Sequence, residues 1–170
     1  MKASPGLRLS LVTVLFVLLV GCVAPDGGFA FGGPECQKVD EKALKWVNWT
    51  RVPEVNVRIR NGEFSPMVIR LRQGWPYVLR IRNRDDTDQV FKAFKFFSKV
   101  AIIKASIGGE VANPKCIGAF RIPPRETAEI RLVAAVDGHY EVENNGIPFL
   151  GGFMGEPHGV IIIEERKPRI

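Results

Sequence analysis

The chain has 170 residues, of which 46% are hydrophobic, and it carries 24 basic against 18 acidic residues. This length suits one domain of moderate size, and the hydrophobic share is sufficient for a packed core. With two histidines and no serine-hydrolase, zinc-protease or phosphate-loop motif, the chain has little material for catalysis. We therefore expect a small domain that is not an enzyme.

The N-terminal residues have the pattern of an export signal. Lys2 and Arg8 precede an apolar run from Leu9 to Val20, which is too short to span a bilayer comfortably. The tetrad Leu19-Val20-Gly21-Cys22 resembles the lipobox of bacterial lipoproteins. This resemblance implies that residues 1–21 are removed and that a lipidated Cys22 anchors the chain to a membrane. Because Val23 rather than aspartate follows, it favours the outer membrane of a Gram-negative host, facing the periplasm.

Two alternatives to lipidation stay open at this point. The segment is either an uncleaved anchor, or an ordinary signal peptide beside which Cys22 has no role. In each case the rest of the chain is exported to the cell envelope.

We interpret residues 22–51 as the connection between lipid and fold. Asp26 to Pro34 is glycine-rich and has no apolar period, which is typical of a flexible stalk. Glu41 to Trp49 contains helix formers after Asp40, a suitable N-cap residue, and predicts a short segment that covers the fold. The domain itself is expected over residues 52–166, followed by a tail at 167–170.

Two cysteines, Cys36 and Cys116, remain after Cys22. In an oxidising compartment we expect a disulfide between them. Such a bond closes a loop of about 80 residues and contributes about 4–5 kcal/mol in the chain-entropy model. A copper or haem thiolate is the alternative, although neither cysteine has a CxxC or CxxCH context.

From Val55 onward, apolar and polar residues alternate, which predicts half-buried strands. The alternating runs are 55–60, 69–72, 79–82 and 128–133. Turn signals such as Asn61-Gly62 and Asp137-Gly138 separate them. Short strands at this spacing predict an all-β sandwich.

The segment from Phe91 to Ile103 departs from this pattern, because Phe91, Phe94, Phe97 and Val100 follow one another at intervals of three. This spacing predicts a short helix. The cluster Phe94, Phe96 and Phe97 also exceeds what one strand face can bury, because neighbours on a strand point to opposite sides.

An ordered set of segments resembles the cupredoxins. Gly62 to Pro66 (GEFSP) and the strand that ends at Asn83 are similar to the opening strands of small cupredoxins. Gln89 to Phe97 (QVFKAFKFF) is similar to the motif H-x-F-x-A-x-x-F-F of a periplasmic cupredoxin-like group. In that group the first residue is a copper-binding histidine.

Later segments extend the resemblance. Ile122 to Ile130 is similar to the family's proline turn and following strand, Gly138-His139-Tyr140 to its G-x-Y strand, and Gly159 to Ile163 to its closing strand. The resemblance covers about Val55 to Glu164. It implies an antiparallel Greek-key β-sandwich of cupredoxin type.

The copper ligands of the family are mostly missing. A blue-copper site uses two imidazoles, one thiolate and a weak axial methionine. Here Gln89 replaces the first histidine, and Tyr140 to Gly152 contains neither cysteine nor histidine. Cys116 precedes the proline turn, which is the wrong segment for the thiolate. We therefore expect no blue-copper centre.

A rebuilt site remains a hypothesis. Met154, Glu156 and His158 lie in the loop before the closing strand, and in a cupredoxin this loop lies beside the position of Gln89. These four residues are the candidate ligands for a copper ion. In the alternative interpretation, Met154 fills the core and His158 makes a hydrogen bond within the loop.

Six arginines occupy the polar positions of three predicted strands. They are Arg58, Arg60, Arg70, Arg72, Arg80 and Arg82. If the three strands share a sheet, all six point to its outer face and form a basic patch. We expect such a patch to bind an acidic partner protein or anionic lipid head groups. The alternative is a solvated face on which arginine stems shield the sheet and pair with glutamates.

The sequence thus supports two hypotheses. The first is a non-enzymatic copper-handling or redox accessory protein of the periplasm, with a weakened or rebuilt metal site. The second is a metal-free interaction module that binds an acidic envelope partner or a membrane surface through its basic face. Resemblance to iron-uptake accessory proteins adds a third option, metal delivery to a membrane permease. We expect no nucleic-acid partner for an exported protein.

Overall fold

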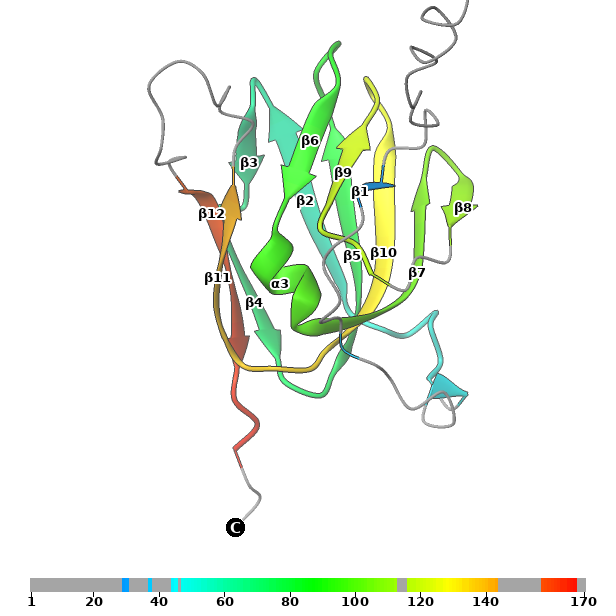
Figure 1. The fold of residues 1–170 in the computed structure, drawn as a ribbon. Coiled ribbons are helices and arrows are strands. Elements are labelled where there is room, and N and C mark those ends of the chain that lie inside the picture. Colours follow the sequence, from blue (N-terminus) through cyan, green and yellow to red (C-terminus); the bar gives the residue numbers. More distant parts are fainter. Residues whose placement is uncertain are drawn as a thin grey trace, which may run out of the picture.

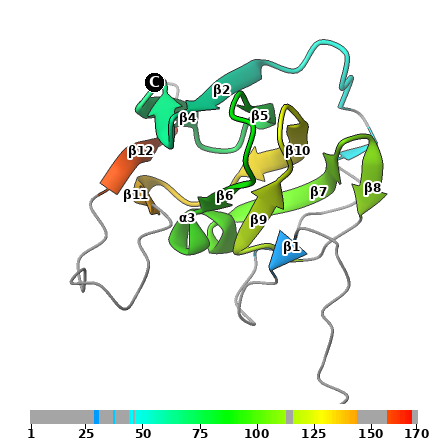
Figure 2. The same ribbon diagram turned by 90° about the horizontal axis from the view of Figure 1, so that it is seen from above.

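The computed structural model describes residues 29–30, 37, 44–45, 47–112, 116–143 and 157–167. These residues form two packed β-sheets with one short helix between consecutive strands (Figure 1). Seen along the strands, the sheets are two separate layers (Figure 2). The all-β sandwich predicted from the sequence is confirmed.

The first layer is a sheet of six strands among the described residues. Its order is β1 (Phe29–Ala30), β9 (Ala119–Ile122), β6 (Gln89–Lys92), β11 (Gly138–Glu143), β12 (Pro157–Glu164) and β4 (Val68–Arg72). The second layer, also of six described strands, has the order β3 (Glu63–Ser65), β2 (Glu54–Arg60), β5 (Pro76–Asn83), β10 (Thr127–Ala134), β7 (Val100–Ile107) and β8 (Glu110–Ala112).

Neither sheet is purely antiparallel, which corrects the predicted sandwich in one respect. β2 and β5 pair in parallel, and so do β4 and β12. Both parallel pairs arise because the chain changes sheets between the partners: β4 of the first sheet lies between β2 and β5 in the sequence.

Alternation places the apolar side chains between the sheets. On β2, Val57 and Ile59 are buried, whereas Asn56, Arg58 and Arg60 are exposed. β10 buries Ala128, Ile130 and Leu132 in the same way. Each large aliphatic side chain buried in this manner stabilises the fold by about 1.5–3 kcal/mol relative to exposure.

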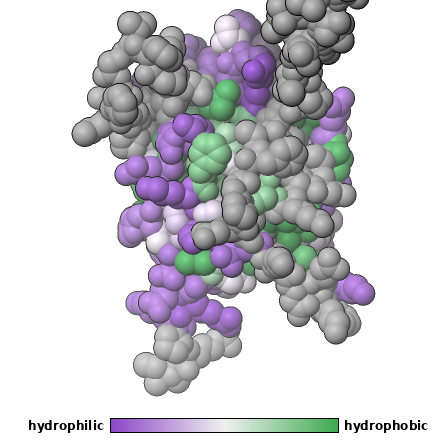
Figure 3. Space-filling view, viewed as in Figure 1, coloured by the Kyte–Doolittle hydropathy of each residue, from purple (hydrophilic) through white to green (hydrophobic). Residues whose placement is uncertain are grey.

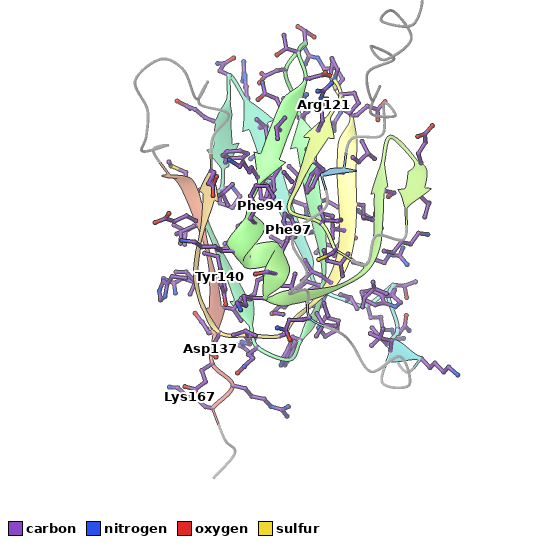
Figure 4. The ribbon with its side chains drawn as sticks, in the orientation of Figure 1. Phe94, Phe97, Arg121, Asp137, Tyr140 and Lys167 are labelled. Carbon is purple, nitrogen blue, oxygen red and sulfur yellow. The ribbon has the colours of Figure 1, made fainter. Side chains whose placement is uncertain are left out.

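One helical turn accommodates the phenylalanine-rich segment. α3 (Phe94–Ser98) follows β6 and lies at the edge of the core (Figures 1 and 4). Phe96 and Phe97 are both fully buried, and Phe97 N donates to Ala93 O at 2.9 Å. A strand would have sent these neighbours to opposite faces. Phe94 stays exposed, with the Lys92 ammonium 5.5 Å from its ring centroid.

The predicted helix is therefore confirmed over five residues only, because residues 100–107 continue as β7. Phe96 and Phe97 join Phe91, Phe120 and Tyr140 in an aromatic cluster with centroid separations of 5.2 to 6.1 Å. Offset and edge-on ring packing of this kind stabilises a core beyond the area that it buries.

The segment before residue 52 is more closely joined to the domain than a free stalk would be. Phe29 and Ala30, within the predicted stalk, pair with Phe120 and Ala119 of β9. Trp49 lies under the guanidinium of Arg131, 5.7 Å from its ring centroid. Of the segment Glu41 to Trp49, residues 44–45 and 47–49 are described, and only Leu44 is helical, so the predicted helix does not extend over residues 47–49. The signal segment and Cys22 lie outside the described residues.

Among the described residues, no helix is long and apolar enough to cross a membrane.

Candidate functional site

One end of the sandwich carries a wide, open groove. It lies where the β2–β3 turn, the β5–β6 loop and the β9–β10 turn meet, and its volume is about 1210 Å³. Arg58, Arg60, Arg84 and Arg125 line it, together with the acids Glu63, Asp85 and Asp86. In Figure 3 this upper end of the molecule is largely hydrophilic. We call this hollow the end groove.

A short turn of left-handed residues forms one wall of the end groove. Asn61 and Gly62 have φ angles of 53° and 76°, which is the geometry of a two-residue hairpin turn. The Asp85 carboxylate accepts from Asn61 N at 2.8 Å and from Gly62 N at 3.3 Å. This carboxylate therefore fixes the β2–β3 turn against the β5–β6 loop.

Gln89 belongs to the same hydrogen-bond network. It is the first residue of β6, and its Nε2 donates to Asp85 Oδ2 at 3.0 Å. The position that the resemblance equates with a copper-binding histidine thus holds an amide that supports the loop. Its amide nitrogen faces a carboxylate rather than an open coordination position.

Asn83 supports the groove from below. It is fully buried, and its Nδ2 is 2.8 Å from Thr87 O and 3.0 Å from the carbonyl oxygens of both Ile122 and Pro123. Its Oδ1 accepts from Asp85 N at 2.9 Å. One side chain therefore links the loop after β5 to the turn after β9, and a buried amide satisfied in this way makes the end rigid.

Four arginines run from this end along the outer face of the second sheet. Arg58 and Arg60 are on β2, Arg82 is on β5, and Arg84 follows β5, where Arg84 N donates to Ile59 O at 2.8 Å. All four side chains belong to exposed residues. Arg58 and Arg84 line both the end groove and a neighbouring hollow that also touches Arg82. We call these four residues the arginine patch.

The arginine patch carries positive charge without close acidic partners. Within the described part of the chain, none of its four members forms an ion pair. Glu63 is the register partner of Arg60 but forms no ion pair with it. The nearby Asp86 is engaged by Arg125, whose Nη2 is 2.7 Å from its Oδ1.

The six-arginine surface predicted from the sequence is split by the fold. β2 and β5 share a sheet as the prediction required, but β4 lies in the other sheet. Arg70 and Arg72 consequently lie on the opposite side of the sandwich. There Arg70 pairs with Glu164 at 3.2 Å, and the Arg72 guanidinium is 5.6 Å from the Trp75 ring centroid.

Arg80 also leaves the predicted set, for an electrostatic reason. Its Nη1 is 3.0 Å from Glu54 Oε2, and its Nε is 3.1 Å from Glu129 Oε2. Acids on both neighbouring strands thus neutralise this arginine, as the solvated-face alternative expected. Arg84 and Arg125 were missed, although Arg84 continues the alternation of Arg80 and Arg82 and could have been found from it.

The other predicted metal ligands are only partly placed. Met154 and Glu156 lie outside the described residues, and His158 is described only as a backbone position in β12. In the sheet register, Lys92 of β6 lies opposite Glu143 of β11, and Glu143 lies opposite Pro157 of β12. Gln89 is three residues before Lys92 on β6, so it lies nearer the end groove than Pro157. Within the described part, no group of three histidines, cysteines or acids could hold a metal ion. The copper site stays a prediction.

The disulfide also stays a prediction. Cys116 lies in the segment before β9, next to the buried Ile117, and Cys36 lies outside the described residues.

No family model matches the sequence, and no curated protein matches it. Among solved structures, a multicopper oxidase from Pseudomonas thermotolerans has a TM-score of 0.49 at 12% identity, over 77% of this chain and 32% of that chain. One from Pediococcus acidilactici has 0.47 at 13%, over 76% and 28%. The blue copper protein auracyanin A from Chloroflexus aurantiacus has 0.41 at 11%, over 65% and 98%.

These similarities concern the fold alone, and the chain spans about a third or less of the length of the two oxidases. The two mixed sheets described above define the described domain as a β-sandwich.

Proposed function

We propose that this chain is a non-enzymatic, lipid-anchored protein of the cell envelope whose cupredoxin-like domain binds an anionic partner. The arginine patch is the binding surface. The observation that carries the proposal is that four neighbouring arginines have no ion pair within the described residues, although acids neutralise Arg80 on the same face. Location on the periplasmic side of the outer membrane belongs to the same proposal, through the lipobox at Cys22.

Guanidinium chemistry defines the kind of partner. Each arginine presents a planar fork of donors that matches carboxylate or phosphate oxygens in pairs. Arg58 and Arg82 are register partners on adjacent strands, so two forks lie close enough to bind one multivalent anion. An acidic protein segment and a phosphate-bearing surface both offer such groups.

The test compares two double variants with the same change in charge. Arg58→Gln/Arg82→Gln removes two members of the arginine patch, and Arg70→Gln/Arg72→Gln is the matched control on the other sheet. Binding of inorganic pyrophosphate and of a polyglutamate peptide is measured by calorimetry on the purified full chain. We expect the first variant to weaken binding by about tenfold or more, since hydrogen bonds between charged groups contribute about 1.5–3 kcal/mol each.

The control variant should bind within about twofold of the native protein, because surface charge away from the site acts only through screened long-range attraction. Equal losses in both variants, or no binding by the native protein, would contradict the proposal.

Copper handling is the second candidate, and one feature of the topology favours it. β11 ends and β12 begins at the same end of the first sheet as Gln89, so the segment with Met154 and Glu156 starts and finishes there. Copper in both oxidation states is titrated into the native chain and into a Met154→Leu/His158→Ala variant. Tight one-to-one binding that the variant loses would support a rebuilt site, and binding no stronger than that of surface histidines would exclude it.

A further inference from the structure

The direction of β1 shows from which end the N-terminal segment reaches the domain. β1 is antiparallel to β9, with Phe29 opposite Phe120 and Ala30 opposite Ala119. β9 runs toward Ile122, which contributes to the Asn83 network under the end groove. Phe29 therefore lies nearer than Ala30 to the end of the sandwich that carries the groove, and β1 enters the sheet from that end. In Figure 1, β9 runs upward beside β1 toward this end.

The length of this segment limits how the domain can turn. Seven residue steps separate Cys22 from Phe29 in the sequence, and seven fully extended residues span at most about 25 Å. An eight-residue strand such as β5 is itself about 26 Å long. A lipid on Cys22 therefore keeps Phe29, which is paired two residues before the groove end of β9, within about 25 Å of the membrane surface.

The arginine patch lies at the same end of the sandwich as the entry of β1. The arginine patch lies at the groove end, and Figure 4 shows Arg121 on β9 toward that end as well. Asp137 and Lys167 lie at the far end of the molecule in the same view. The four arginines of the patch, which have no ion pair among the described residues, thus lie at the end from which β1 enters the sheet, whereas Arg121 there is paired with Asp88.

We propose that the groove end of the domain faces the leaflet that holds Cys22, and that the arginine patch binds anionic phospholipid head groups of this leaflet. The inference rests on the proposed lipidation of Cys22 and on the proposed anion binding by the patch. Phosphodiester oxygens accept the paired hydrogen bonds that arginines offer. A short tether raises the effective concentration of head groups at the patch, and each arginine at an anionic surface strengthens binding by about fivefold.

The experiment uses the full chain purified from a membrane and reconstituted in two kinds of vesicle. One kind is pure phosphatidylcholine, and the other is an equimolar mixture with phosphatidylglycerol. Phenylglyoxal modifies accessible arginines, and mass spectrometry gives the rate for each one. The same spectra report whether Cys22 is acylated, and an unmodified Cys22 would overturn the inference.

We expect phosphatidylglycerol to slow modification of Arg58, Arg60, Arg82 and Arg84 several-fold, while Arg72 and Arg166 react at the same rate in both vesicles. In Arg58→Gln/Arg82→Gln, the protection of Arg60 and Arg84 should decrease, and its circular dichroism should remain that of the native β-sandwich. A second variant with a long Gly-Ser insertion after Val23 should lose part of the protection, because a longer tether lowers the effective concentration.

Equal rates in the two vesicles would overturn the inference. If pyrophosphate and polyglutamate still bind the patch in solution, anion binding stands and the partner is an acidic protein. If pyrophosphate and polyglutamate also fail to bind, both the lipid inference and the proposed anion binding are overturned.

Discussion

Arg58 on β2 and Arg82 on β5 are direct register partners in parallel strands, and neither has an ion pair among the described residues. Like charges directly opposite one another destabilise a sheet. Two residues earlier on the same two strands, Asn56 is the partner of Arg80, which two glutamates neutralise. The repulsion between Arg58 and Arg82 is a local destabilisation that a bound anion would relieve.

Substitution of Arg82 by glutamine should raise the free energy of unfolding of the isolated protein by about 0.2–1 kcal/mol at low salt. The gain arises because one of two facing positive charges is removed. Urea denaturation at about 0.01 M and 1 M salt measures it, and the gain should shrink at the higher concentration as screening increases. A loss of stability at low salt would contradict the view that this pair is strained.

The matched variant Arg80→Gln should act in the opposite direction. It removes pairs with Glu54 and Glu129, at N–O distances of 3.0 and 3.1 Å. Partly exposed ion pairs contribute about 0–1 kcal/mol each, so we expect a small decrease in stability. Opposite signs for two arginines on one strand would show that their partners, and not their charge alone, set the effect.

Asp85→Ala should destabilise the protein by about 1–3 kcal/mol. The substitution removes the acceptor of Asn61 N, Gly62 N and Gln89 Nε2, and hydrogen bonds to a charged group are among the stronger ones. Urea denaturation measures the loss. The control is Asp88→Ala, because Asp88 is exposed and makes one pair with Arg121 at 3.6 Å; its effect should stay within about 0.5 kcal/mol.

The same Asp85→Ala variant should also loosen the end groove. Amide hydrogen exchange at Asn61 and Gly62 is expected to become faster, since their N–H groups lose their acceptor. Unchanged exchange at both residues would mean that the turn is held by its own backbone geometry alone.

Tyr140→Phe should lower the free energy of unfolding by about 0.5–1.5 kcal/mol near neutral pH. The Tyr140 hydroxyl is 3.0 Å from the carbonyl oxygens of both Val136 and Asp137. Burial, with a further contribution from the Asp137 charge, raises the pKa of Tyr140 above its ordinary value of 10.0.

The pH dependence of this difference follows from the direction of the pKa shift. Below pH 10 the hydroxyl is protonated in both states, so its contribution is fully present. Above that pH the unfolded chain ionises first, and the contribution is lost as pH rises through the folded pKa. Denaturation of native and Tyr140→Phe protein at pH 8 to 11 should show the difference decreasing, and a constant difference would contradict the assignment.

Local patterns predicted the strands well because burial alternates along them. Val57 and Ile59 point inward and Arg58 and Arg60 outward, as the spacing requires. The pattern says nothing about which strands pair, however. β4 has the same alternation as β2 and β5, and only the long-range pairing with β12 places Arg70 and Arg72 on the other face.

The candidate site was less predictable for the same reason. Gln89 was identified through its place in a motif, but its bond to Asp85 depends on where the β5–β6 loop folds. The sequence pattern predicts Asn83 only as the end of a strand. Its contacts with Thr87, Ile122 and Pro123 form only because β9 lies beside β6. Phe29 and Ala30 likewise form a strand only because β9 offers a free edge.

Nuclear magnetic resonance of the arginine side chains shows whether the arginine patch binds anions. Inorganic pyrophosphate is titrated into the native protein while the Nε–H signals are followed. We expect saturable shifts at Arg58, Arg60, Arg82 and Arg84, with small or no shifts at Arg70, Arg72 and Arg80. Shifts spread evenly over all arginines, or confined to those outside the patch, would contradict it.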